Sequence, residues 1–214
     1  LKVNPEDNIC IKAYQLLKKD YDLPGISIHL HKIIPVGAGL GGGSSDAAYM
    51  LKNLNKLFHL NISSKLLLEY AGKLGSDCPF FIDNKTVFAY ETGNRFMELD
   101  LDLRGYYIVI MYPGIHINSG KAYSKALIKT PDNSLKDMVK LPVEEWKNII
   151  QNGFENTIFE EYPEIKNIKK ELYNMGALYA SMSGSGSALY GIFDSMPEIK
   201  KSLKNYLIWQ YRIP

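Results

Sequence analysis

Apolar and polar residues follow two kinds of spacing along this chain, one typical of helices and one typical of strands. Apolar residues recur at helical spacing in the ranges 8–19, 45–58, 63–73 and 165–175. Shorter stretches with the same spacing predict helices at 121–128, 143–151 and 198–207. Buried or alternating apolar residues predict strands at 26–36, 86–91 and 106–113, and a hairpin within 177–193. The predicted fold class is therefore α+β.

Residues that favour helix ends support two of these boundaries. Ser63 or Ser64 is suited to cap the helix that follows it, and Gly176 is suited to end the helix at 165–175. The chain shows no internal repeat, and a boundary between two domains is expected near residues 98–105. We therefore predict one domain at residues 1–98 and a second at residues 99–214.

The composition is that of an ordinary globular protein. Of the 214 residues, 46% are hydrophobic and 22% are charged, and the formal net charge is +2. This balance does not support a nucleic-acid partner or binding to an acidic membrane surface. We expect neither a membrane span nor a secretory signal, and hence a cytoplasmic protein. Cys10 and Cys78 lack the spacing of a metal site and are expected to be reduced packing residues.

Candidate chemistry is concentrated in the stretch IPVGAGLGGGSSDAA, which contains five glycines between the predicted strand at 26–36 and the helix at 45–58. Glycine allows positive φ angles and a close approach of the backbone to a ligand. Successive backbone N–H groups then form a concave anion site in front of a helix N-terminus. We expect Ser44, Ser45 or Asp46 to cap that helix. The Asp46 carboxylate is expected to bond the backbone, since it would repel a phosphate if it faced the anion site. Lys32 is expected to be a solvated lysine at the strand end.

Other phosphate-binding loops fit this stretch less well. A Walker loop requires Lys directly after its last glycine, where this chain has Ser44. Residues 37–42 satisfy the dinucleotide pattern G-x-G-x-x-G, but residues 60–64 lack the acidic residue that this fold requires. The catalytic motifs of protein kinases are also missing from the sequence.

The stretch PVGAGLGGGSS at 35–45 resembles the ATP-phosphate loop of the GHMP kinases, a family of small-molecule kinases. LGSDCPFF at 74–81 and SMSGSGS at 181–187 are similar to the second and third motifs of that family. The sequence GLGGGSSDAA most resembles the loop of those members that phosphorylate a cytidine-diphosphate-linked methylerythritol in non-mevalonate isoprenoid biosynthesis. The resemblance implies a two-domain fold, with an N-terminal domain like domain 2 of ribosomal protein S5 and a ferredoxin-like C-terminal domain.

The resemblance also implies roles for individual residues. Asp77 would be catalytic, accepting the proton of the attacking hydroxyl or orienting it. Asn8 and Ile9 would lie near the adenine of ATP, and Ser44 or Ser45 would touch Mg²⁺. Substrate or phosphate contacts would come from Ser119, Gly184, Ser185 and Gly186. The loop residues that would bind ATP are Pro35, Val36, Gly37, Ala38, Gly39, Leu40, Gly41, Gly42, Gly43, Ser44 and Ser45.

Each of these residues also has a simpler explanation. Asn8 and Ile9 would serve equally as a helix cap and a core residue, and Asp77 as a turn or cap residue. The range 183–187 also fits a plain glycine hairpin turn, and Asn118-Ser119-Gly120 fits the start of a helix. The pattern within the chain leaves these alternatives open.

One part of the family pattern is not found in this chain. Members of this type begin with a strand that carries a catalytic lysine, followed by a tyrosine–histidine segment that binds the cytidine. No residue here matches those positions, so we expect the N-terminal domain to be incomplete. Another GHMP kinase, or a nucleotide-binding module without catalysis, therefore stays an alternative. The expected partner is a small-molecule substrate, with no nucleic acid or membrane, and the chain is expected to be a monomer or homodimer.

Overall fold

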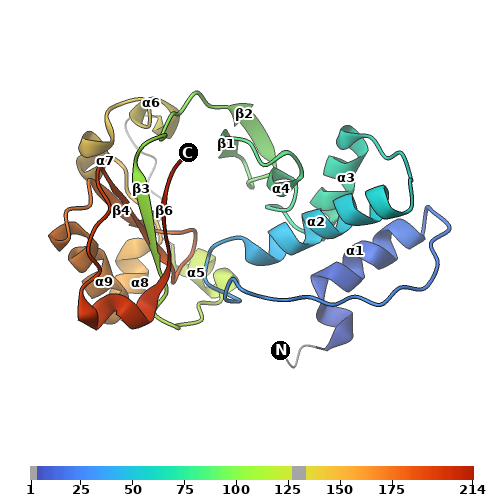
Figure 1. Cartoon of the computed structure of the whole chain (residues 1–214), viewed down its shortest axis with the longest axis horizontal. Coiled ribbons are helices and arrows are strands. Elements are labelled where there is room, and N and C mark those ends of the chain that lie inside the picture. The colour runs from blue at the N-terminus through green and yellow to red at the C-terminus, as the bar shows by residue number, and fades with distance from the viewer. Residues whose placement is uncertain (1–3, 127–133) are drawn as a thin grey trace. The chain divides into compact units, whose positions relative to one another are not determined.

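The computed structural model describes residues 4–126 and 134–214. The chain divides into two compact units, which are coloured along the chain in Figure 1. The first unit consists of Leu1–Ile33 and Gly41–Leu99, and the second consists of Ile34–Leu40 and Asp100–Pro214. The glycine-rich stretch is therefore shared: residues 34–40 belong to the second unit, and the chain returns to the first unit at Gly41.

The first unit is built mainly of helices. They are the 3₁₀ helix η1 (Pro5–Asp7) and the α-helices α1 (Ile9–Lys18), α2 (Gly42–Leu57), α3 (Ser64–Leu74) and α4 (Phe80–Asp83). Strands β1 (Val87–Tyr90) and β2 (Arg95–Glu98) form an antiparallel hairpin. The core lies where α1, α2 and α3 bring together their apolar faces, including Leu17, Leu51, Leu54 and Tyr70. The Ser63 side chain accepts a hydrogen bond from the Leu66 amide and caps α3, as predicted.

The predicted strand at residues 26–36 is wrong. This segment contains neither helix nor strand, although its side chains alternate as a strand's would. A strand requires a neighbour that completes its backbone hydrogen bonds. Within residues 4–126 and 134–214, β1 and β2 pair with each other and no strand pairs with this segment. Several of its apolar residues, among them Ile28, Leu30 and Ile33, consequently remain exposed, and Ile33 has an exposed fraction of 75%.

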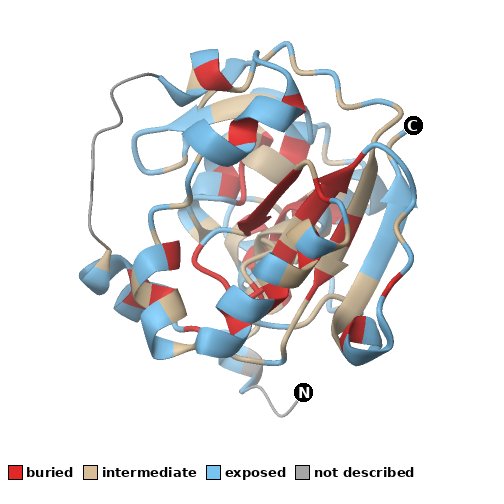
Figure 2. Ribbon diagram, turned by 90° about the vertical axis from the view of Figure 1, so that its left-hand side faces the viewer, coloured by how far each residue is buried: buried red, intermediate tan, exposed pale blue. Residues whose placement is uncertain are grey.

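The second unit is organised around an antiparallel sheet with the strand order β4-β5-β3-β6 among the described residues. Its strands are β3 (Tyr107–Met111), β4 (Tyr179–Met182), β5 (Leu189–Phe193) and β6 (Leu207–Arg212). Pairs such as Met182↔Leu189 and Ile108↔Ile192 fix the register. Strand β4 is fully buried, whereas the last four residues of β6 are exposed (Figure 2).

The second unit also contains helices, some of which pack against this sheet. They are α5 (Ser119–Lys125), α6 (Leu135–Met138), α7 (Val143–Ile149), α8 (Glu155–Glu161) and α9 (Pro163–Asn174), with the 3₁₀ helix η2 (Lys201–Tyr206). Ile165 and Leu172 of α9 are completely buried against the sheet residues Leu189 and Phe193. Gly176 follows α9 with a φ of +96°, as predicted for a residue that ends a helix.

Most predicted elements are confirmed, with corrections near the C-terminus. The helix expected at 198–207 is a shorter 3₁₀ helix, Lys201–Tyr206, and strand β6 follows it directly. Aromatic and branched residues in LIWQYR favour a strand once β3 offers a partner. Strand β2 and helix α8 are additional elements. The helix expected at 121–128 is α5, and residues 127 and 128 lie outside the described residues.

Candidate functional site

Residues 34–40 pack in the second unit against the loop that joins β4 to β5. We call Ser183–Ala188 the serine–glycine loop. The Ala38 carbonyl accepts a hydrogen bond from the Ala188 amide at 2.9 Å, and the Gly39 carbonyl accepts one from Ser183 Oγ at 2.8 Å. Gly39 has a φ of +77°, and a Cβ there would lie 2.3 Å from the Ser183 carbonyl oxygen. Only glycine allows this approach of backbone to backbone.

The serine–glycine loop brings several predicted residues together. Ser119 Oγ and Ser185 Oγ lie 3.1 Å apart and share a hydrogen bond. The Ser187 hydroxyl, which is fully buried, donates to the Ile115 carbonyl. Within one unit, the structure thus places Ser119 beside Ser185, and the two ends of the loop beside residues 38 and 39. The loop is a hairpin connection and also the surface that supports the first half of the glycine stretch.

The second half of the glycine stretch begins helix α2 in the first unit. The helix starts at Gly42, three residues earlier than predicted, and its N-cap is Gly41 with a φ of +67°. No side chain of a described residue caps it, so the expected capping by Ser44, Ser45 or Asp46 is wrong. The first intrahelical amide, that of Ser45, donates to the Gly41 carbonyl at 2.9 Å. The preceding N–H groups have no intrahelical acceptor and lie at the positive end of the helix.

Lys32 and Asp46 form an ion pair in the first unit. Lys32 is therefore not the solvated lysine that the sequence predicted, and Asp46 is not a helix cap. The Lys32 ammonium donates to Asp46 Oδ2, and the two side chains have exposed fractions of 13% and 21%. Asp46 lies too far into α2 to reach the free amides of the first turn. A partly buried carboxylate needs a counter-charge, which Lys32 supplies. The pair therefore neutralises negative charge near the start of α2.

Asp77 lies exposed in the turn between α3 and α4. The next residue, Cys78, is fully buried, and burial raises the pKa of its thiol above the ordinary value. Cys78 packs in the same core as Ala47 and Leu51 of α2. Through this packing, the turn that carries Asp77 is fixed to the helix that begins the second half of the glycine stretch.

Asn8 and Asn118 both begin helices. The Asn8 side chain accepts a hydrogen bond from the Cys10 amide at 2.9 Å, and Ile9 packs against the core of the first unit. The Asn118 side chain accepts one from the Lys121 amide at 2.9 Å, which places Ser119 first in α5. The simpler structural explanations are therefore present. The proposed adenine contact of Asn8 and Ile9 stays a prediction.

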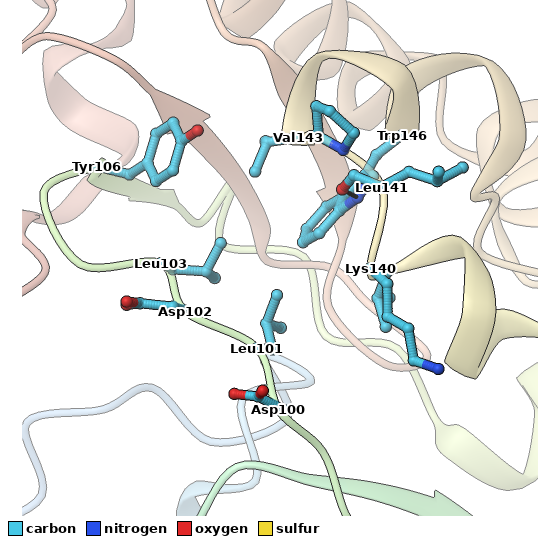
Figure 3. Close-up of a pocket in the computed structure, with 11 residues that line it drawn as sticks. Asp100, Leu101, Asp102, Leu103, Tyr106, Lys140, Leu141, Val143 and Trp146 are labelled. Atoms are coloured by element: carbon cyan, nitrogen blue, oxygen red, sulfur yellow. Dashed lines mark hydrogen bonds between the residues drawn. The ribbon is translucent and has the colours of Figure 1, made fainter.

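A cavity of about 490 Å³ lies elsewhere in the second unit (Figure 3). Part of its lining is apolar, because Leu101 and Leu103 pack with Val143 and Trp146, and the Trp146 indole donates to the Leu141 carbonyl. None of the predicted site residues lines this cavity. The position of the candidate site therefore follows from loop geometry and not from cavity size.

Two further features bear on metal and membrane binding. Within the described ranges, no three His, Cys, Asp or Glu side chains lie together as a metal site. No helix of the part that the structure describes is long and apolar enough to span a bilayer.

Comparison with known families decides the relationship. The family described as GHMP kinases N terminal domain matches residues 8–85, and GHMP kinases C terminal matches residues 134–208. A protein of Azobacteroides pseudotrichonymphae genomovar. CFP2 is 55% identical over 188 residues, which are 87% of this chain and 70% of that protein. This chain belongs to the GHMP kinase family.

Two similar proteins carry the same name. The Azobacteroides protein and a protein of Bacteroides fragilis are both named 4-diphosphocytidyl-2-C-methyl-D-erythritol kinase. The Bacteroides protein is 50% identical over 197 residues, which are 92% of this chain and 72% of that protein. A crystal structure of 4-(cytidine 5'-diphospho)-2C-methyl-D-erythritol kinase has a TM-score of 0.76 at 30% identity, covering 90% of this chain and 71% of that one. The predicted α+β class and GHMP kinase fold are confirmed.

Some interacting residues were not indicated by any motif. The Lys32–Asp46 pair joins residues 14 positions apart, and no periodic pattern relates them. Asn152, whose side chain bonds two carbonyl groups of the 182–184 segment, was also missed. Its position directly before Gly153 in the NGFENTIF stretch was the available signal, since asparagine before glycine favours a turn.

Proposed function

We propose that this chain binds ATP along residues 35–45 and phosphorylates the 2-hydroxyl of 4-diphosphocytidyl-2-C-methyl-D-erythritol, a step of isoprenoid biosynthesis. The observation that carries the ATP site is the start of α2, where N–H groups without intrahelical partners follow a left-handed Gly41. The name shared by relatives at 50–55% identity supports the substrate.

The chain would contribute position and electrostatics to this reaction. Phosphoryl transfer requires mainly alignment and stabilisation of charge on the transferred group. The amides at the start of α2 would hold the phosphates, and the Lys32–Asp46 pair keeps a carboxylate from repelling them. Asp77 would accept the proton of the attacking hydroxyl, and its exposed position leaves it accessible to a substrate.

Mg²⁺ is part of the same proposal. The hydroxyls of Ser44 and Ser45 lie in the first turn of α2 and offer the hard oxygen ligands that this ion prefers. When bound, the ion would neutralise charge on the phosphates. We also propose that the enzyme acts in the bacterial cytoplasm as a monomer or homodimer.

Replacing Asp77 with Asn tests the assigned chemistry. Turnover should fall by about 10²–10⁴-fold, because the amide cannot accept the proton. The affinity for ATP should change by less than about twofold, since Asp77 does not hold the phosphates. ADP release with the methylerythritol substrate and calorimetric titration with ATP measure the two quantities.

The matched control is Asp22→Asn, a second exposed aspartate of the first unit. This variant should keep both turnover and ATP affinity. Loss of ATP binding with turnover retained in Asp77→Asn would contradict the assigned role. Absence of ADP release from an unmodified chain that binds ATP would contradict the kinase activity itself.

A further inference from the structure

Asn152 lies between α7 and α8 and uses its whole side-chain amide. Its Nδ2 donates to the Met182 carbonyl at 2.8 Å and to the Gly184 carbonyl at 2.8 Å. Its Oδ1 accepts a hydrogen bond from the Phe154 amide at 2.9 Å. One side chain thus connects the end of β4 to the second residue of the serine–glycine loop.

Glu155 also bonds the end of β4, at the amide of Met182. Its Oε1 accepts a hydrogen bond from the Met182 amide at 2.8 Å, and its Oε2 accepts one from Lys169 Nζ at 2.6 Å. Glu155 is buried, and Lys169 provides the charge that its carboxylate needs. Met182 therefore has both its N–H and its C=O fixed by side chains of the segment 152–155.

The serine–glycine loop, which Asn152 and Glu155 fix at the end of β4, is hydrogen-bonded in turn to the glycine stretch. Ser183 lies between the two residues that Asn152 holds, and its hydroxyl donates to the Gly39 carbonyl at 2.8 Å. The Ala188 amide, at the other end of the loop, donates to the Ala38 carbonyl. All of these residues belong to the second unit, so the path from Asn152 to Gly39 is continuous within it.

We propose that Asn152 is a positioning residue of the phosphate-binding loop, acting through Ser183 on the carbonyl of Gly39. This inference rests on the proposed ATP site at residues 35–45. Gly184 is exposed, so water can satisfy its carbonyl when the amide is removed. The bond from Asn152 to this carbonyl therefore fixes the loop's position more than it prevents a buried unsatisfied group.

Two substitutions of Asn152 separate position from stability. Asn152→Ala removes both donors, and we expect ATP to bind about tenfold more weakly, in line with the sensitivity of bound ligands to small displacements. Asn152→Asp keeps the acceptor for Phe154 but places a carboxylate against two carbonyl oxygens, and its loss should be larger. The matched control is Asn156→Ala, an exposed asparagine on α8, which should bind ATP as the unmodified chain does.

Calorimetric titration with ATP distinguishes the two kinds of damage. A displaced loop raises Kd while the number of sites per chain stays at the unmodified value, and Tm changes little. A reduced number of sites at unchanged Kd would mean that Asn152 only supports folding, and would overturn the inference.

A double-mutant cycle with Ser183→Ala tests the path itself. If Asn152 acts through Ser183, the double variant should bind ATP about as weakly as the weaker single variant. Losses that multiply would show independent actions and would overturn the path. Normal Kd in both single variants overturns the inference alone, whereas an unmodified chain that binds no ATP overturns the proposed function as well.

Discussion

The two halves of the glycine stretch use the same residue type for different physical purposes. In residues 34–40, glycine lets the backbone of Gly39 lie against the serine–glycine loop, with its carbonyl bonded to Ser183. In the second half, Gly41 adopts a left-handed conformation and serves as the N-cap of α2. The first amides of α2 have no intrahelical partners. The first half is therefore fixed by packing, and the second half supplies the donors for an anion.

This comparison predicts that equal substitutions will have unequal effects. Gly39→Ala should be the most damaging, because its Cβ would lie 2.3 Å from one carbonyl oxygen and 2.7 Å from that of Gly186. We expect a loss of about 3 kcal/mol or more in the free energy of unfolding, since neither obstacle is a flexible side chain. Denaturant titration measures this loss.

Gly43→Ala is the matched control in the second half. A Cβ at Gly43 meets no atom of a described residue within 4 Å, and the residue is helical. Alanine should therefore stabilise the chain by up to about 1 kcal/mol. Equal stability losses at positions 39 and 43 would remove the distinction between the two halves.

Gly41→Val should affect binding more than folding. A Cβ there would lie 2.8 Å from the outer ring atom of Phe81, which can move, although the φ of +67° is unfavourable for valine. The helix start should be displaced, and ATP binding should be lost while the chain remains folded. Calorimetry together with circular dichroism measures both, and unchanged ATP affinity would contradict the assignment of the second half.

Lys32→Met tests the electrostatics of the second half. It leaves the partly buried Asp46 carboxylate without its partner, and we expect a destabilisation of about 1–2 kcal/mol, below the cost for a fully buried pair. ATP should also bind more weakly, because a free carboxylate then lies near the start of α2. Lys56→Met, on the exposed face of the same helix, is the control. Tighter ATP binding by Lys32→Met would contradict this account.

The smallest expected effect concerns the pH dependence of the second unit. Lys121 and Lys125 on α5 both donate to Glu161 on α8 and lower its pKa from 4.5 to about 2. Because the unfolded chain takes up this proton first, the stabilisation is present above pH 4.5 and is lost as the pH falls toward 2. Glu161→Gln should lower Tm by a few degrees at most at pH 7, with the difference from the unmodified chain shrinking below pH 4.5. A difference that grows on acidification would contradict the assignment.

Sequence patterns predicted what depends on local spacing. The helical periodicity of α1, α3 and α9 and the capping residues Ser63 and Gly176 are confirmed, because these depend on neighbours within one or two turns. The segment 26–36 has the period of a strand, but pairing depends on a partner from elsewhere in the chain. Strand β6 illustrates the same limit, because β3 provides its partner.

The candidate site shows the same division. The glycine stretch and its motif partners were predictable, because they are continuous in sequence and resemble a known family. The roles of Lys32 and Asn152 were not, because each depends on contacts with residues 14 or more positions away. Side chains that position a loop carry no motif of their own, and only the folded structure identifies them.

The most direct test of the central claim is a crystal structure of this chain with a nonhydrolysable ATP analogue. The account predicts phosphate oxygens within about 3 Å of main-chain nitrogens at the start of α2, between Gly41 and Ser45. A triphosphate bound at other residues, with no phosphate at these nitrogens, would contradict it.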